Sequence, residues 1–156
     1  MTAIPPTVEY GHAEIVPVYF DDLDAMGIVH HARYAFLFDR ALEGYWGRRG
    51  YTVDPGALDG DAFQAVRELT LTYRRPINRP GAVAVHFWVE HLGRTSLRYG
   101  LRILSVDGAT VYAEGSRAAV LLDPATMQPA PFSDAGREAV TPLLRPTAEA
   151  GISAGA

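Results

Sequence analysis

A single helix-length stripe of apolar residues, followed by segments that alternate with period two, restricts the folds open to this chain. From Tyr34 to Tyr45 apolar residues recur at i, i+3, i+4, i+7, i+8 and i+11, which predicts one amphipathic helix ending near Gly50. Apolar and polar residues then alternate in four segments, which predicts strands at 68–73, 83–90, 96–103 and about 110–122.

Short connections set the expected order of these strands. An earlier strand is predicted at 12–20, where Pro17 confines it to a sheet edge or a bulge. Turn residues join the later strands at 78–81, 93–94 and 107–108, which predicts antiparallel hairpins and a meander. The sequence therefore predicts an α+β fold with one long helix and an antiparallel sheet of about five strands. A short helix is expected at 133–144.

One helix covers only one face of such a sheet. Ala84, Trp88 and Val120 fall on the other face, so we expect part of that face to be an oligomer interface.

Composition narrows the class of protein. With 156 residues, of which 48% are hydrophobic, the chain suits one domain, with a core at about 12–132 and a flexible tail at 146–156. A net charge of -4 argues against nucleic-acid binding. The N-terminus lacks a secretory pattern and no apolar run is long enough to cross a bilayer, which predicts a cytoplasmic protein without membrane insertion.

Several kinds of catalysis lack their residues. All 14 basic residues are Arg, and Cys is absent, so lysine Schiff bases and cysteine nucleophiles are excluded. None of the five serines lies in a G-x-S-x-G turn, and no H-E-x-x-H or glycine-rich nucleotide loop occurs. We therefore expect neither a metal site nor a cofactor.

The segment 20–34 carries the remaining candidates. No Ser, Thr, Asp or Asn directly precedes the helical stripe, so backbone N–H groups at the helix start are available to hold an oxyanion. Asp22 and Asp24 lie upstream, and Gly27 permits a tight turn or a close approach to a ligand. The alternative is that both carboxylates only make turn hydrogen bonds and that Asp24 caps the helix from a distance.

This segment reads F-x-D-x-D-x-x-G-I-V-x-H-x-x-Y and is followed by a helix containing Phe38-Asp39-Arg40-Ala41. With Phe63–Pro76, Gly93–Ser96 and Asp123-Pro124, it resembles the hotdog-fold thioesterases of the 4-hydroxybenzoyl-CoA and Tol-Pal-associated acyl-CoA type. The resemblance implies a hotdog fold, in which a curved antiparallel sheet wraps one long helix. It also implies a homodimer or homotetramer with active sites between subunits.

The resemblance also assigns roles. Asp24 matches the catalytic carboxylate and the backbone N–H of His31 the donor to the thioester carbonyl, while the His31 ring could instead orient the loop or bind substrate. Asp22 matches a recurring acid, and Met26, where the family has a small residue, would narrow the site. The candidates for binding coenzyme A are Arg74 and Arg75, then Arg94, Thr95 and Ser96, with Arg79 in addition.

The sequence thus predicts a thioesterase acting on an acyl or aroyl thioester of coenzyme A or of acyl carrier protein, with Asp24 as general base or nucleophile. Two alternatives stay open. The chain could be a hotdog dehydratase or cyclase acting on a carrier-bound acyl chain, or a non-catalytic acyl-CoA-binding protein.

Overall fold

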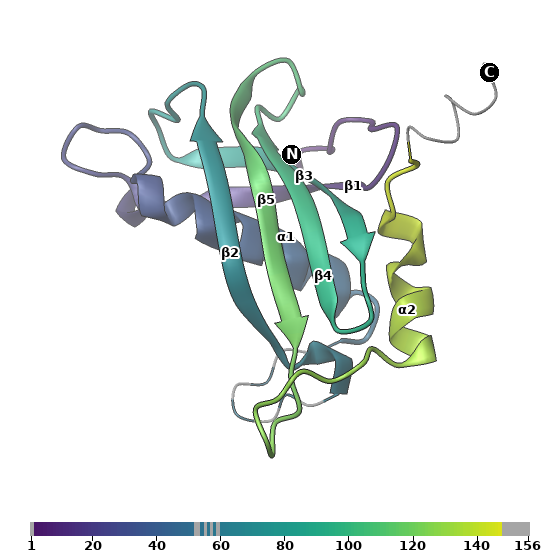
Figure 1. Ribbon diagram of the computed structural model, residues 1–156. Coiled ribbons are helices and arrows are strands. Elements are labelled where there is room, and N and C mark those ends of the chain that lie inside the picture. The colour runs from purple at the N-terminus through teal and green to yellow at the C-terminus, as the bar shows by residue number, and fades with distance from the viewer. Residues whose placement is uncertain (1, 52–53, 55, 57, 59, 148–156) are drawn as a thin grey trace.

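The computed structural model describes residues 2–51, 54, 56, 58 and 60–147. One antiparallel sheet with the strand order β1-β3-β4-β5-β2 forms the body of the molecule (Figure 1). Its strands are β1 (His12–Val18), β2 (Gln64–Tyr73), β3 (Gly81–Leu92), β4 (Ser96–Leu104) and β5 (Val111–Leu121). β1 lies at one edge, as Pro17 predicts, and β2 at the other.

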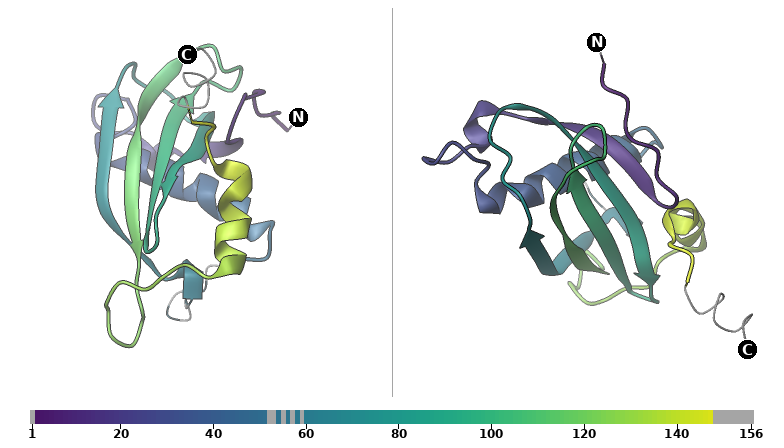
Figure 2. Two further views of the ribbon diagram at one scale, coloured as in Figure 1. Left: turned by 45° about the vertical axis from the view of Figure 1, so that its right-hand side comes forward. Right: turned by 90° about the horizontal axis from the view of Figure 1, so that it is seen from above.

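The predicted helical stripe is the centre of the core. Helix α1 (Tyr34–Gly47) lies on one side of the sheet (Figures 1 and 2), and all six residues of the stripe are buried. They pack against the inner face of the sheet, which includes Val16 of β1, Phe87 of β3 and Leu101 of β4. Each fully buried large apolar side chain contributes on the order of 1.5–3 kcal/mol, so this contact is the main attachment of the helix to the sheet.

The predicted meander is correct for β3, β4 and β5 and wrong for β2. β2 does not pair with β3 across residues 74–80 but pairs with β5, with Gln64 opposite Leu121 and Tyr73 opposite Ala113. β1 occupies the edge of β3 instead, with Ile15 opposite Ala84. The 74–80 connection is therefore a crossover, and it is anchored where the N–H of Val29 donates to the carbonyl of Ile77 at 2.8 Å.

The outer face of the sheet is covered by the chain itself at β3. Trp88 is only 4% exposed, since the rings of Tyr10 and His86 lie 5.3 and 4.8 Å from it and Arg102 and Arg145 also flank it. Ala84 is fully buried as well. The expectation that these two residues form an oligomer interface is therefore wrong.

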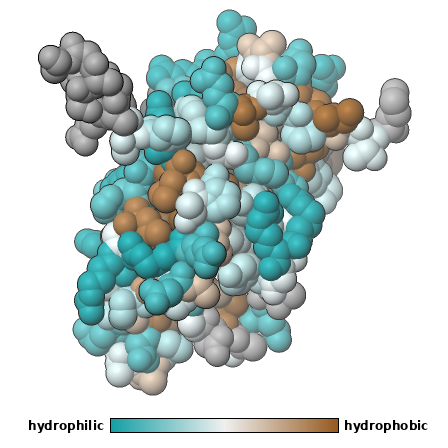
Figure 3. All heavy atoms as spheres, turned by 90° about the vertical axis from the view of Figure 1, so that its right-hand side faces the viewer, coloured by the Kyte–Doolittle hydropathy of each residue, from teal (hydrophilic) through white to brown (hydrophobic). Residues whose placement is uncertain are grey.

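Strand β2 is the exposed edge of the sheet. Its apolar side chains Val66, Leu69 and Tyr73 are 55%, 39% and 47% exposed. The opposite side of the molecule, which carries α2, shows only small separate groups of hydrophobic side chains (Figure 3).

The predicted terminal helix is present as α2 (Asp134–Val140) with a 3-10 turn, η4 (Thr141–Leu143). Ser133 caps α2 by accepting a hydrogen bond from the N–H of Gly136. Val140 and Leu143 belong to the apolar core, which extends past residue 132. Of the predicted tail, residues 148–156 lie outside the described part. No helix in that part is long and apolar enough to cross a membrane.

The pairing of β2 with β5 depends on the absence of a side chain at Gly115. A Cβ there would overlap the backbone carbonyl of Thr70 on β2. We expect Gly115→Ala to lower the free energy of unfolding by about 1–3 kcal/mol in urea denaturation, because backbone atoms must shift. Gly47→Ala is the control, since its Cβ would meet no atom within 4 Å and it removes a helix glycine. Equal stability of the two variants would contradict this account.

Candidate functional site

The segment 20–34 folds into a small closed loop before α1. The 3-10 turn η1 (Phe20–Asp22) leads into a bridge between Leu23 and Val29. The N–H of Asp24 donates to the carbonyl of Ile28 at 2.8 Å, and the N–H of Gly27 donates to the carbonyl of Asp24 at 3.0 Å. Gly27 has φ +76°, a conformation that residues with a Cβ rarely adopt. Glycine at this position therefore sets the shape of the loop.

The Asp24 carboxylate is held at the mouth of this loop. Its Oδ1 accepts hydrogen bonds from the N–H groups of Met26 at 2.8 Å and Ile28 at 3.5 Å. Asp24 thus makes the turn contacts that the sequence offered as the alternative to catalysis. Its Oδ2 receives no hydrogen bond from the described residues, and the side chain is half-buried. One oxygen therefore holds the loop, and the other is unbound within the described part of the chain.

Helix α1 itself has no side-chain cap, as the sequence predicts, because Arg33 at its N-cap position makes no capping hydrogen bond, but the chain before it is already helical. A 3-10 turn, η2 (His31–Arg33), precedes the helix, and the ring Nδ1 of His30 accepts a hydrogen bond from the N–H of Ala32 at 3.1 Å. The N–H of Arg33 donates to the carbonyl of His30. Among the three N–H groups of η2, those of Ala32 and Arg33 thus have acceptors, and that of His31 has none within the described part of the chain. The sequence did not predict His30 as the cap of this turn, because Ser, Thr, Asp and Asn are the usual capping residues.

The carboxylate of Asp22 lies beneath the loop and forms a bidentate ion pair with Arg40 of α1. The Oδ2–Nη1 and Oδ1–Nη2 distances are 2.9 and 3.1 Å, and Oδ2 also accepts from the N–H of Tyr19 at 2.8 Å. Asp22 is 0% exposed. Burial alone would raise the pKa of this carboxyl, but the hydrogen bonds from Arg40 and Tyr19 outweigh it and hold the pKa below its ordinary value. Both oxygens are therefore occupied within the chain.

The other predicted residues fall into two places. Tyr73 donates from its hydroxyl to the carbonyl of His31 at 2.8 Å, so Arg74 and Arg75 follow directly on a residue that contacts the loop. Both are exposed, as is Met26, and Arg74 pairs with Glu114 at 3.3 Å.

The Gly93–Ser96 hairpin lies at the far end of the sheet, beside α2 (Figures 1 and 2). There Arg137 of α2 donates to the carbonyl of Gly93 at 2.9 Å, and the N–H of Phe132 donates to that of Arg94 at 3.0 Å. Within one copy of the chain, Arg94, Thr95 and Ser96 are thus separated from Asp24.

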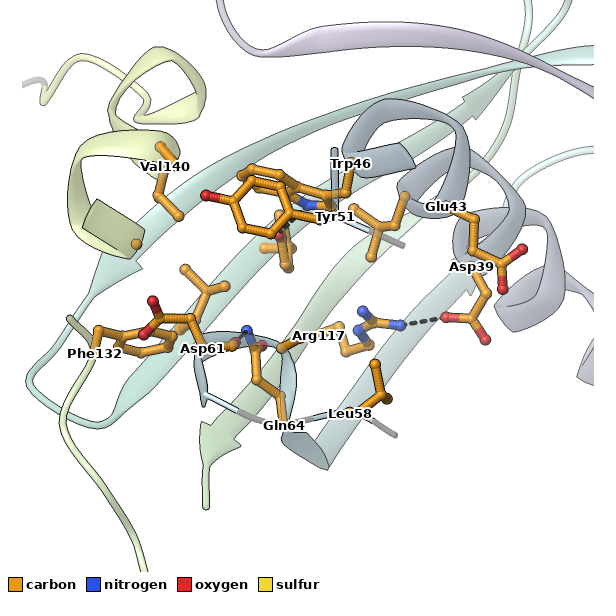
Figure 4. Close-up of a pocket in the computed structure, with 16 residues that line it drawn as sticks. Asp39, Glu43, Trp46, Tyr51, Leu58, Asp61, Gln64, Arg117, Phe132 and Val140 are labelled. Carbon is orange, nitrogen blue, oxygen red and sulfur yellow. Dashed lines mark hydrogen bonds and ion pairs between the residues drawn. The ribbon is translucent and has the colours of Figure 1, made fainter. Parts of the chain in front are cut away.

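A cavity of about 270 Å³ lies between α1, the 3-10 turn η3 (Gly60–Ala62), α2 and the inner face of β4 and β5 (Figure 4). It contains Arg117, which pairs through Nη1 with Asp39 Oδ1 at 2.6 Å. We did not predict this cavity from the sequence. The sequence does contain an indication of it. Arg117 lies on the same face of β5 as the buried residues Ala113, Ala119 and Leu121, so a charged side chain is expected to point inward there.

No group of three or more His, Asp or Glu side chains in the described part of the chain is arranged to hold a metal ion.

A five-stranded antiparallel sheet around one long helix, with a loop carboxylate and a backbone donor at the helix start, defines a hotdog domain. Residues 26–112 match the sequence model of the thioesterase superfamily, and the chain belongs to that family. The match begins two residues after Asp24.

Curated and solved relatives agree with this assignment. The acyl-CoA thioester hydrolase YbgC of Escherichia coli is 28% identical over 114 residues, which are 73% of this chain and 84% of that protein. A thioesterase from Thermus thermophilus, solved with coenzyme A and Zn, is 30% identical, with a TM-score of 0.67 and coverage of 82% of this chain and 95% of that one. A Pseudomonas aeruginosa protein with a TM-score of 0.76 is 23% identical, covers 87% and 93% of the two chains, and shows the fold. The predicted fold class is confirmed.

The ion pair between Asp22 and Arg40 gives the loop a measurable acid sensitivity. The folded pKa of Asp22 lies below the ordinary 3.8, so its stabilisation is complete above that value and is lost as the pH falls through the folded pKa. We expect Asp22→Asn to cost about 3 kcal/mol at pH 7, near the lower end for a broken buried pair, since the Arg40 side chain is 25% exposed.

Urea unfolding measured from neutral to strongly acidic pH tests this expectation. The loss caused by Asp22→Asn should shrink as the pH falls, because the wild-type carboxylate becomes protonated as well. The exposed neighbour Asp21 is the control, and Asp21→Asn should change stability little. A loss for Asp22→Asn that does not depend on pH would contradict the role of the charge.

Proposed function

We propose that this chain hydrolyses acyl-CoA thioesters, with Asp24 and the backbone N–H of His31 as its reacting groups. The observation that carries the proposal is that one loop holds a carboxylate with one oxygen unbound, and that the N–H of His31, seven residues on at the start of the helical segment, has no acceptor among the described residues. The names of the relatives, acyl-CoA thioester hydrolase and a thioesterase solved with coenzyme A, support the substrate class. The same proposal includes the subtype, which is the 4-hydroxybenzoyl-CoA and Tol-Pal-associated type of thioesterase. It also includes acyl carrier protein as a second possible carrier of the acyl group.

The proposed reaction needs only groups that the loop holds. The thioester carbonyl accepts a hydrogen bond from the N–H of His31, which stabilises the oxyanion. Asp24 Oδ2 either takes a proton from a water molecule that attacks the carbonyl carbon, or attacks that carbon itself to give an anhydride that water then hydrolyses. In both routes the carbon–sulfur bond breaks, the sulfur leaves with a proton as the thiol, and the acid is released.

Asp22 has a different role in this proposal. Since both its oxygens are bound to Arg40 and Tyr19, it anchors the loop to α1 and does not contact substrate. Gly27 shapes the loop, and the exposed Met26 lies at its mouth. Arg74, Arg75 and Arg94 remain the candidates for the coenzyme A phosphates, with Thr95 and Ser96 beside the pantetheine arm.

A homodimer that pairs along β2 would join the two separated parts of the site. At one end of β2, Tyr73 contacts His31. At the other end Gln64 pairs with Leu121, whose N–H donates to the carbonyl of Thr95 at 2.8 Å. Two β2 strands related by a twofold axis run antiparallel, so the Tyr73 end of one copy meets the Gln64 end of its partner. The partner's Thr95 and Ser96 would thereby approach Asp24.

We expect Asp24→Asn to lower kcat for acyl-CoA thioesters by about 10² to 10⁴, the usual contribution of a general base. The asparagine side-chain oxygen can still accept from the N–H of Met26, so the loop and the unfolding midpoint should be unchanged. Thiol release from a panel of acyl-CoA and acyl-carrier thioesters measures the effect, with Asp21→Asn as the control.

The same panel separates the competing functions. Turnover of the Asp24→Asn variant close to that of the wild type would exclude the carboxylate from the mechanism. Altered acyl chains without thiol release would favour a dehydratase or cyclase, and binding without any product would favour an acyl-CoA-binding protein.

We expect the double substitution Val66→Glu and Leu69→Glu to convert the dimer into monomers, because it places like charges along the exposed β2 edge. Sedimentation velocity measures the mass, and thiol release should fall with it because each site draws on both copies. Ile4→Glu is the control, since Ile4 is 83% exposed on the N-terminal segment. A monomeric wild type, or a double variant that stays dimeric, would contradict the proposed interface.

A further inference from the structure

Two consecutive peptide groups meet at His31, and three of their four polar groups are held by hydrogen bonds. The carbonyl of His30 accepts from the N–H of Arg33 at 2.8 Å. In the next peptide group, the carbonyl of His31 accepts from the Tyr73 hydroxyl at 2.8 Å, and the N–H of Ala32 donates to the ring Nδ1 of His30 at 3.1 Å. The fourth group, the N–H of His31, has no acceptor among the described residues. These bonds fix both peptide planes, and with them the direction in which the N–H of His31 points.

Burial does little to hold this turn, because His30, His31 and Ala32 are all exposed. The backbone supplies only the bond from Arg33 to these two peptide groups. The N–H of His30 also donates to the carbonyl of Asp22 at 2.9 Å, but it belongs to the peptide group before them. The other two bonds come from side chains, one within the turn and one from the last residue of β2. The direction of the His31 N–H therefore depends on two side chains that are distant in sequence.

Each of these two side chains is itself held by a second contact. The Tyr73 ring packs edge-on against the ring of Tyr34, the buried first residue of α1, with the ring centres 5.0 Å apart and the planes at 80°. The His30 ring stacks on the ring of His31, with the centres 4.2 Å apart. Nδ1 of His30 accepts a hydrogen bond only in the neutral ring that carries its proton on Nε2. The hydroxyl and the ring nitrogen are thus presented to the backbone in defined places.

The direction of an oxyanion donor has a large effect on the rate of acyl transfer. Such donors work because they already point at the oxygen on which charge develops, and removal of one donor costs about 10² to 10³ in kcat. A misplacement of about 1 Å can cost on the order of 10²-fold. A side chain that holds the peptide groups of His31 can therefore change the rate without touching the substrate.

We propose that His30 and Tyr73 are positioning residues, whose ring Nδ1 and hydroxyl aim the N–H of His31 at the carbonyl oxygen of the bound thioester. The effect on the reaction rests on the proposed thioesterase function. The hydrogen bonds that hold the two peptide groups are independent of that function.

Removal of one hydroxyl tests the role of Tyr73. We expect Tyr73→Phe to lower kcat for acyl-CoA thioesters about tenfold, which is a part of the loss that follows when a donor is removed outright. KM should change little, because the donor acts mainly on the oxyanion and not on the bound ground state. Tyr10→Phe is the control, since it removes a hydroxyl from a ring that packs on Trp88 on the outer face of the sheet. Equal kcat of Tyr73→Phe and the wild type would overturn the role of Tyr73.

Two similar amides at position 30 separate the capping atom from the rest of the ring. The side-chain oxygen of asparagine lies the same number of bonds from Cα as Nδ1 of histidine, whereas that of glutamine lies one bond further. We expect His30→Gln to lower kcat about tenfold with little change in KM, and His30→Asn to retain most of the wild-type kcat. If His30→Asn is no more active than His30→Gln, the role of Nδ1 is overturned.

Backbone NMR of the isotope-labelled protein distinguishes failure of this inference from failure of the proposed function. The order parameter of the His31 N–H bond should be close to the value of about 0.85 for rigid backbone, and it should fall in the double variant His30→Gln and Tyr73→Phe. The amide of Leu101 in β4 is the control and should not change. If no thioester is hydrolysed but this difference holds, the thioesterase proposal fails and the positioning of the N–H stands. Equal order parameters of the His31 N–H in the wild type and the double variant overturn the inference, whatever the activity.

Discussion

The packing of α1 against the inner face of the sheet is the contact on which the other parts of the molecule depend. Its six buried residues supply the largest continuous apolar surface of the helix, and they fix both its direction and its rotation. Once that rotation is set, Arg40 faces Asp22 in the preceding loop and Asp39 faces Arg117 on β5. The helix thereby connects the loop that holds Asp24, at its start, to the cavity along its length, through two neighbouring residues that carry opposite charges.

The two ion pairs of α1 differ in how completely their atoms are hydrogen-bonded. In the pair between Asp22 and Arg40, both carboxylate oxygens accept hydrogen bonds and Asp22 is fully buried. This is the pattern of a structural contact. The pair between Asp39 and Arg117 leaves the Nε of Arg117 buried without an acceptor among the described residues.

Much of the fold was predictable because it depends on local periodicity. The helical stripe from Tyr34 to Tyr45 and the alternating strands specify their own buried faces, and Pro17 marks β1 as an edge strand. The position of β2 was not predictable, since pairing with β5 instead of β3 depends on contacts distant in sequence. Trp88 was misjudged for the same reason: Tyr10 and Arg145, which cover it, come from opposite ends of the chain.

Some features of the candidate site were likewise predictable from the sequence and others were not. The spacing of Asp24, Gly27 and His31 placed all three in one loop, because a segment of eight residues leaves few ways to close. The separation of Gly93–Ser96 from that loop could not be read from the order of residues, and neither could the burial of Asp22. The charge at Arg117 on an inward-facing phase of β5 was visible in the sequence, but its meaning required the cavity around it.

The contacts of helix α2 bear on which parts of the molecule can change independently of one another. The helix is tied to the cavity by Asp61, which binds the N–H and hydroxyl of Ser133, and to the β3–β4 hairpin by Arg137. Gly136 makes room for Asp61, since a Cβ there would overlap the carboxylate. None of these contacts involves the loop that holds Asp24. The segment that borders the cavity is therefore held in place independently of the loop that holds Asp24, so mutation can reshape the cavity and leave that loop unchanged.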